Sequence, residues 1–347
     1  MAGAGGCGGR AGVVGPAALR GNPGRGDLPG RDLAAAVTDP ASAAAPVVAV
    51  VGPTAVGKSA LGVALARELS GEVVNADSMQ LYAGMDIGTA KVTAAEAAGV
   101  PHHLLDIWPV TEPASVAAYQ RLARAAVDRV RSAGRTAVLV GGSGLYVQAV
   151  LDAMEFPGTD PALRAELEQE LAQHGPDPLY RRLRERDAEA AARILPSNGR
   201  RIVRALEVIA LTGGPFVAAL PAEATPVYDA VRIGLDLPTE VLDERVERRV
   251  DRMWAAGLVD EVRTLAARGL AEGRTASRAL GYQQVLRYLA GECAEAAARD
   301  ETVRATRRFV RRQRSWFRRD RRIHWLAADR PDLTAAAVEL VRGAPSG

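Results

Sequence analysis

Lysine is almost absent from this chain of 347 residues, because only two of its 44 basic side chains are lysines. Cysteine is just as scarce. Cys7 and Cys293 lie far apart and neither belongs to a CxxC pair, so a disulfide framework or a cysteine-bound zinc site has no support, and we expect free thiols. No run approaches the roughly 18 apolar residues of a membrane span, and the N-terminus lacks the apolar core of a secretion signal. These absences predict a cytoplasmic protein without membrane association.

The composition otherwise suits a folded protein of one or two domains, with 48% hydrophobic and 24% charged residues. Residues 1–45 differ, since they are mostly Ala, Gly, Pro and Arg without periodicity, and we expect them to be disordered. The net charge of +3 is unevenly spread, because residues 301–322 carry ten arginines and only two acidic residues. Positive charge is therefore concentrated near the C-terminus.

One of the two lysines, Lys58, lies in a glycine-rich run of the kind that binds phosphate. The run matches GxxxxGK[ST], in which backbone N–H groups and a helix N-terminus hold phosphate oxygens. The apolar run 46–51 before it suits a buried parallel strand, and residues 60–69 suit a helix, which is the order that this loop requires. Such a loop most often indicates an ATP-using enzyme. The candidate phosphate-binding residues are Gly52, Pro53, Thr54, Ala55, Val56, Gly57, Lys58 and Ser59.

A second predicted strand, residues 72–76, leads directly to Asp77. Ligands of open α/β sheets bind beyond the carboxyl ends of the strands, so Asp77 is expected near the phosphate site, where a carboxylate can accept a proton or hold a metal. Helix capping is the alternative. A polar loop at 84–91, which contains the second lysine, could close over a ligand. The pair His102 and His103 does not favour a metal site, because adjacent residues rarely face one ion.

The end of the next predicted strand argues against an ATP-driven motor and fits a site where the backbone must approach a bulky ligand closely. The predicted strand 136–140 ends in a glycine-rich run, 141–146, where such ATPases usually carry a magnesium-binding Asp. Beyond it, charged helical segments replace the strand pattern and predict a helical insertion at 157–225. In its last segment Asn198 is a plausible N-cap, and the arginines of the first turns oppose the helix dipole, which favours an anionic partner over a solvated face.

The chain then returns to the sheet with a predicted strand at 231–237 and a helix at 238–254. Arg245 and Arg249 lie on one face of that helix, where one of them could reach a second phosphate, although surface salt bridges are equally consistent. The C-terminal helix has an apolar seam flanked by arginines, which favours nucleic-acid binding. We therefore predict an α/β fold, a P-loop NTPase-like core with a parallel sheet flanked by helices. The core is expected at 46–156 and 226–331, with a C-terminal tail at 332–347.

Seven motifs occur in one order, at 52–59, 77–91, 102–106, 141–146, 200–208, 278–282 and 306–320. In this order the motifs resemble those of the bacterial tRNA dimethylallyltransferases, also called isopentenyl-tRNA transferases, over residues 47 to about 325. The resemblance implies transfer of a dimethylallyl group from dimethylallyl diphosphate to the N6 amine of the adenosine 3′-adjacent to the anticodon, with Mg²⁺ and release of diphosphate.

The resemblance also implies roles for individual residues. Lys58, and Mg²⁺ held partly by Ser59, would stabilise charge on the departing pyrophosphate, with Arg249 as a further clamp and Arg245 as second choice. Asp77 would accept the proton of the N6 amine. The residues placed against the tRNA anticodon stem-loop are Asp77, Ser78, Met79, Gln80, Ser143, Arg164, Arg200, Arg201, Arg204, Arg308, Arg311 and Arg312.

The sequence departs from the family pattern at a few positions. Ser59 and Ser143 stand where the family often has Thr, and Gln283 replaces a common Lys. Two other functions stay open: a small-molecule P-loop kinase, which would not explain the basic helix or the insertion, and an adenylate isopentenyltransferase, whose acceptor is a free nucleotide. For the oligomeric state we expect a monomer.

Overall fold

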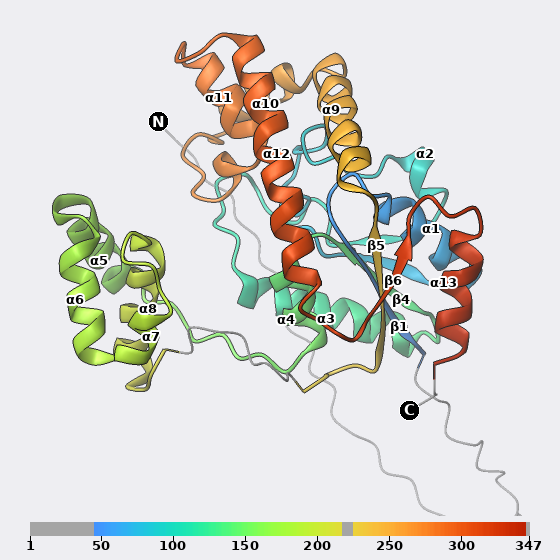
Figure 1. Cartoon of the computed structure of the whole chain (residues 1–347), viewed down its shortest axis with the longest axis horizontal. Helices are drawn as coiled ribbons and strands as arrows, with labels where there is room; N and C mark the ends of the chain where they lie inside the picture. The colour runs from blue at the N-terminus through green and yellow to red at the C-terminus, as the bar shows by residue number, and fades with distance from the viewer. Residues whose placement is uncertain (1–44, 217–224, 345–347) are drawn as a thin grey trace, which may run out of the picture. The chain divides into compact units, whose positions relative to one another are not determined.

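Six parallel strands form one sheet in the part of the chain that the computed structural model describes, residues 45–216 and 225–344 (Figure 1). The strand order is β3-β2-β4-β1-β5-β6, so the strand before the phosphate loop is central and is flanked by β4 and β5. This confirms the predicted α/β fold. The strands are β1 (Val47–Val51), β2 (Glu72–Asn75), β3 (His102–His103), β4 (Ala137–Gly141), β5 (Ala230–Asp236) and β6 (Ile323–Ala327).

Helices cover both faces of the sheet because successive side chains of its strands point to opposite sides. In β1, Ala49 packs into an apolar cluster with α3 and α4, whereas Val50 packs into a second cluster with α1 and α13. Every residue of β1 and β4 is buried, which explains why these strands read as continuous apolar runs. The helices are α1 (Lys58–Glu68), α2 (Ala94–Ala97), α3 (Val116–Ser132), α4 (Gly144–Leu151) and α13 (Leu333–Arg342).

The described part of the predicted insertion contains four helices with an apolar cluster of their own, in which Leu179, Leu183 and Ile202 are fully buried. Asn198 caps the last of these helices as expected, since its side chain accepts a hydrogen bond from the N–H of Arg201. The helices are α5 (Pro161–His174), α6 (Pro176–Arg186), α7 (Ala188–Ala192) and α8 (Gly199–Thr212).

After β5 the chain forms a second helical group, in which α9 and α12 lie side by side (Figure 1). A fourth apolar cluster, which includes Tyr82, Leu258 and Tyr282, joins this group to the segment that follows β2. The members are α9 (Thr239–Ala255), α10 (Leu258–Ala266), the 3₁₀ turn η1 (Ala276–Arg278), α11 (Tyr282–Leu289) and α12 (Glu295–Phe317).

The C-terminal tail expected at 332–347 is in large part a helix. Ala337, Val338 and Val341 of α13 are buried in the same apolar cluster as α1, because their spacing puts them on one helical face. The expectation of disorder at 1–45 falls almost wholly outside the described residues. Within the described ranges, no helix combines the length and apolarity that crossing a membrane requires.

Candidate active site

The phosphate loop begins where β1 ends, and glycines shape it at two points. Gly52 has a φ of 141°, and a Cβ there would lie 2.5 Å from the carbonyl oxygen of Leu235, so only glycine fits. Gly57 has a φ of 110° and is the N-cap of α1, whose first residue is Lys58. The loop therefore delivers the lysine to a helix N-terminus, where backbone N–H groups are available for an anion.

The surroundings of Lys58 do not fully compensate the burial of its positive charge. Its Nζ donates a hydrogen bond of 2.7 Å to the carbonyl oxygen of Pro53. Burial lowers the pKa of the Lys58 ammonium from 10.5 to about 8; Asp77 opposes this change and Arg249 reinforces it. A ligand that brings negative charge would therefore stabilise the ammonium, which is the behaviour expected of a phosphate site.

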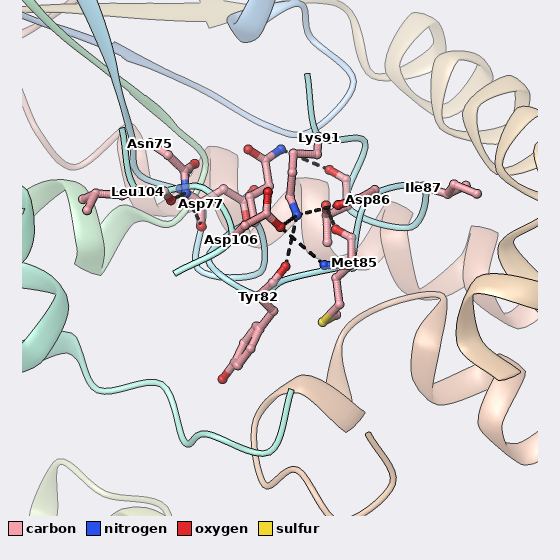
Figure 2. A network of polar contacts seen from close by, with 12 residues as sticks. Asn75, Asp77, Tyr82, Met85, Asp86, Ile87, Lys91, Leu104 and Asp106 are labelled. Atoms are coloured by element: carbon pink, nitrogen blue, oxygen red, sulfur yellow. Dashed lines mark hydrogen bonds and ion pairs between the residues drawn. The ribbon is translucent and has the colours of Figure 1, made fainter. Parts of the chain in front are cut away.

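Asp77 follows β2 in a turn that the neighbouring Asn75 holds rigidly (Figure 2). The Asn75 side chain accepts from the N–H of Asp77 at 2.9 Å and donates to the carbonyl oxygens of Asp77 and Leu104, each at 3.0 Å. One carboxylate oxygen of Asp77 accepts from the N–H of Met79 at 2.9 Å. No helix begins at this point in the described structure, so helix capping, the alternative role for Asp77, is wrong.

The charge of Asp77 affects the pKa of groups on four parts of the chain. It raises the pKa of Lys58 and of Arg249 against the stronger effect of burial, which lowers both. Burial raises the pKa of Tyr119 and Tyr146, and Asp77 raises both further. These groups belong to the phosphate loop, α9, α3 and α4.

Ser143 connects the carboxyl end of β4 to the turn after β2. Its Oγ accepts from the N–H of Ser78 and donates to the Oγ of Ser78, both at 3.2 Å. Ser78, Met79 and Gln80 all keep part of their surface exposed beside Asp77. The structure therefore brings together the residues that the sequence placed next to the acceptor base.

Arg249 extends from α9 to the phosphate loop, in agreement with its expected position. Its guanidinium donates to the Thr54 hydroxyl at 3.0 Å and to the carbonyl oxygen of Thr89 at 3.4 Å. Arg245, one turn earlier, donates to the carbonyl oxygen of Val56 at 3.4 Å. Two arginines of one helix thus contact the loop, and burial lowers the pKa of the Arg249 guanidinium.

The segment 84–91, expected to be a flexible loop, is held by two charged side chains. The Glu261 carboxylate accepts from the N–H groups of Asp86, Ile87 and Gly88 at 3.1, 2.7 and 3.3 Å. Lys91 donates to Asp86 at 2.6 Å, and Figure 2 shows its ammonium between this carboxylate and Asp106. The second lysine therefore fastens the loop in the structure.

The same segment contributes to the site through one carbonyl group. The oxygen of Thr89 accepts from Arg249 and from the Gln80 Nε2, the latter at 3.2 Å. Tyr282 donates to Glu261 at 2.5 Å, and its ring lies where a Cβ on Gly88 would clash, 2.4 Å away. The motif at 278–282 thus supports the loop next to Arg249.

Gln313 on α12 was not among the predicted site residues, yet it contacts the phosphate loop. Its Oε1 accepts from the N–H of Thr54 and its Nε2 donates to the carbonyl oxygen of Gly142, both at 2.9 Å. The one available signal was a polar residue between Val310 and Phe317 on the apolar seam of the helix.

The arginines of the insertion fall into two groups. Arg164 and Arg204 both bind the carboxylate of Glu207, which is completely buried. Glu207 supplies an anionic partner for Arg204 within the chain, and the contact of Arg204 with tRNA stays a prediction. Arg200 and Arg201 are exposed in the first turn of α8.

The arginines of α12 are also less free than the sequence indicated. Arg308 pairs with Glu301 at 2.7 Å, and Arg311 pairs with Asp243 of α9 at 3.0 Å. The guanidinium of Arg312 lies 5.7 Å from the centre of the Phe309 ring. Part of the local positive charge is therefore neutralised by carboxylates of the same helix and of α9.

The histidine pair lies in the short strand β3 rather than in the site. The His103 Nε2 lies 2.5 Å from a Glu72 oxygen, and the His102 Nδ1 lies 2.8 Å from the carbonyl oxygen of Val100. The described residues contain no cluster of three or more His, Cys, Asp or Glu side chains arranged to hold a metal ion. Ser59 is exposed in the first turn of α1, and its role as a metal ligand stays a prediction.

A family model described as IPP transferase matches residues 80–320. The chain belongs to the IPP transferase family. It is 71% identical over 302 residues to a tRNA dimethylallyltransferase of Salinispora arenicola, covering 87% of this chain and 88% of that protein. A tRNA dimethylallyltransferase of Thermobifida fusca is 65% identical over 300 residues, covering 85% and 94%. The resemblance stated from the motifs is confirmed.

Solved structures of IPP transferases share the fold. The tRNA isopentenylpyrophosphate transferase of Bacillus halodurans has 41% sequence identity and a TM-score of 0.63, covering 86% of this chain and 94% of that one. A eukaryotic dimethylallyltransferase acting on tRNA has 24% identity and a TM-score of 0.72, covering 87% and 81%. The second likeness concerns the fold alone.

Proposed function

We propose that this IPP transferase moves a dimethylallyl group from dimethylallyl diphosphate to the N6 amine of the adenosine 3′-adjacent to the anticodon of tRNA. The observation that carries the proposal is that the turn with Asp77 lies beside the phosphate loop: Gln80 of this turn and Arg249 bind the same carbonyl oxygen of Thr89, and Arg249 also binds the loop at Thr54. A base beside an anion site suits a reaction in which a diphosphate leaves while a proton is removed. The names of the close relatives support the same reaction.

The diphosphate end of the reaction requires stabilisation of negative charge. As the allylic C–O bond breaks, both bonding electrons go to the departing diphosphate oxygen. Lys58, Arg249 and the N–H groups at the start of α1 are cations and dipoles fixed in advance, so they need no rearrangement when this charge develops. The glycines at the end of β4 stand where a motor ATPase would carry a carboxylate. Their presence fits a site in which diphosphate leaves from a carbon atom and no nucleotide is hydrolysed.

The acceptor end requires a base, because the lone pair of the N6 amine is delocalised into the adenine ring. As the new C–N bond forms, Asp77 takes the proton that the amine loses. Gln80 uses its Nε2 to bind the carbonyl oxygens of Thr89 and Ala90, which leaves its Oε1 to accept from the base. Ser143 and the turn that it binds would line the pocket for the adenine, which must leave its stack to enter.

The residues present also fit Mg²⁺. This ion prefers oxygen ligands and usually binds through one or two protein groups together with substrate phosphates. The exposed hydroxyl of Ser59, next to Lys58, is such a group, and the lack of a larger carboxylate cluster in the described residues agrees with a site completed by the diphosphate. When bound, Mg²⁺ would neutralise charge on the leaving group.

The arginines proposed for the tRNA differ in how available they are. Arg200 and Arg312 are the stronger candidates because both side chains are exposed, and Arg201, which is also exposed, stays among the proposed contacts. Arg308 and Arg311 would have to exchange a carboxylate for a phosphate. Such contacts act on the backbone and position the stem-loop without reading its sequence.

Nucleoside analysis after a defined reaction tests the proposal. Purified protein is incubated with tRNA, Mg²⁺ and dimethylallyl diphosphate, and the digested RNA is analysed by mass spectrometry. We expect adenosine that carries one dimethylallyl group. Parallel reactions offer free AMP with dimethylallyl diphosphate, and ATP with a nucleoside as phosphate acceptor. Prenylated AMP with unmodified tRNA would instead indicate an adenylate isopentenyltransferase, and ADP together with a phosphorylated nucleoside would indicate a kinase.

A further inference from the structure

We infer that Gln313 is a positioning residue for the diphosphate: from α12 it holds the phosphate loop in the conformation that binds the leaving group. The inference rests on the proposed function, since it names the residue that holds the phosphate loop in the conformation for binding the diphosphate of the donor. Gln313 is 5% exposed and lies on the face of α12 opposite to solvent. It reaches two backbone groups at the carboxyl ends of neighbouring parallel strands, β1 and β4.

Both backbone groups need a partner at this position. The N–H of Thr54 and the carbonyl oxygen of Gly142 lie just beyond the ends of their strands, where the sheet no longer supplies hydrogen bonds. A buried backbone group without a partner is costly. The Gln313 carboxamide offers an acceptor and a donor at one end, and it serves both groups at 2.9 Å.

The close approach of the carboxamide depends on glycine at the end of β4. A Cβ on Gly142 would lie 2.4 Å from the Gln313 Nε2 and 3.4 Å from the Lys58 Nζ. The glycine therefore opens the space in which the carboxamide and the phosphate-binding ammonium approach the same backbone. This links Gln313 to the diphosphate site and not only to the packing of α12.

Thr54 is held from two sides. Its N–H donates to Gln313, and its hydroxyl accepts from Arg249 at 3.0 Å. The two helices that supply these groups also bind each other, through Arg307 with Glu247 at 2.8 Å and through Arg311 with Asp243. Since Thr54 lies at the start of the loop, its orientation sets the direction of the N–H groups that follow toward Lys58. Losing the Gln313 bonds should therefore loosen the anion site before it affects the acceptor base.

The test replaces Gln313 by a side chain of similar length without hydrogen-bonding groups. For Gln313→Met we expect the affinity for inorganic pyrophosphate with Mg²⁺, measured by calorimetry without tRNA, to fall about 5- to 30-fold, the equivalent of one or two hydrogen bonds. The KM for dimethylallyl diphosphate should rise by the same factor. The kcat at saturation and the affinity for tRNA should stay within about threefold, a split that a general loss of structure would not produce.

Thr302→Val is the matched control. Thr302 is on the same helix, is 2% exposed, and its hydroxyl bonds only within the helix, to the carbonyl oxygen of Ala298. We expect no change in pyrophosphate affinity. If Gln313→Met does not fold, Gln313→Asn keeps the carboxamide but withdraws it by one methylene, and it should weaken pyrophosphate binding in the same direction.

The outcomes separate this inference from the proposed function. Unchanged pyrophosphate affinity in Gln313→Met or Gln313→Asn, in a protein whose wild type binds pyrophosphate and prenylates tRNA, would overturn the positioning role. A wild type that binds pyrophosphate but adds no prenyl group to RNA would overturn the proposed function. The effect of Gln313 on the anion site could then still be measured from the pyrophosphate affinity of its variants.

Discussion

The two lysines of the chain should have opposite effects on stability. Removing Lys58 should stabilise the free protein, because the folded state lowers the pKa of its ammonium from 10.5 to about 8 through burial. The unfolded chain therefore binds that proton more tightly, and at pH 7 the charged lysine costs folding free energy. Lys91 should behave in the opposite way, since its ammonium binds Asp86 and Asp106 at 2.6 and 2.5 Å.

The magnitude for Lys58 follows from its pKa. The decrease from 10.5 to about 8 corresponds to about 3 kcal/mol at pH 7. Partial exposure of the residue lowers this figure, and Lys58→Met also loses the bond to the Pro53 carbonyl, worth about 1 kcal/mol. We expect a net gain in the free energy of unfolding of about 1–2 kcal/mol. The gain should persist below pH 8 and decline toward pH 10.5.

For Lys91→Met we expect a loss of about 2 kcal/mol, because the side chain is 6% exposed and its removal takes one donor from each of two carboxylates and from the Tyr82 carbonyl. Urea unfolding of wild type and both variants at pH 7 and pH 9.5 measures these differences from the midpoints at constant slope. Calorimetry should show in parallel that Lys58→Met no longer binds pyrophosphate. A Lys58→Met protein less stable than wild type at pH 7, or a gain that does not shrink at pH 9.5, would refute the reasoning.

Three further substitutions test the reaction, the donor site and the RNA contact. Asp77→Asn should lower turnover by about 10²- to 10⁴-fold in single-turnover assays and leave tRNA affinity intact; undiminished turnover would exclude Asp77 as the base. Arg249→Met should raise the KM for dimethylallyl diphosphate by about 10-fold or more through the lost charged contact, whereas Arg252→Met, an exposed residue whose guanidinium binds within the same helix, should not. Arg312→Ala should weaken tRNA binding and reduce its salt dependence more than Arg308→Ala, whose arginine is paired with a carboxylate; equal effects would contradict this order.

The sequence predicted best what depends on burial and on local spacing. The strand 47–51 is apolar throughout because both of its faces are covered, and the glycines after it are needed where the chain turns tightly. β6 was not predicted, because it is an edge strand with three exposed residues and lacks a continuous apolar run. α13 was missed although its apolar spacing could have indicated a helix.

Contacts between residues far apart in the chain could not be predicted from the sequence. Gln313 binds groups 259 and 171 residues away, and neither partner is a side chain that a motif could reveal. The Glu207 carboxylate that binds Arg164 and Arg204 could have been suspected for Arg204 from its spacing, but its complete burial could not. The ion pairs of Lys91 with Asp86 and Asp106 were likewise not predicted, and they hold the segment 84–91, which was expected to be flexible.

The central claim is that the N6 amine of one adenosine, the residue 3′-adjacent to the anticodon, receives the dimethylallyl group. Two anticodon stem-loop RNAs test it most directly. They are identical except that one carries inosine at that position, where an exocyclic carbonyl oxygen replaces the amine. After incubation with Mg²⁺ and dimethylallyl diphosphate, mass spectrometry of the fragments should show one prenyl group at the adenosine and none on the inosine RNA. A prenyl group on the inosine RNA, or at another position of the adenosine RNA, would contradict the account.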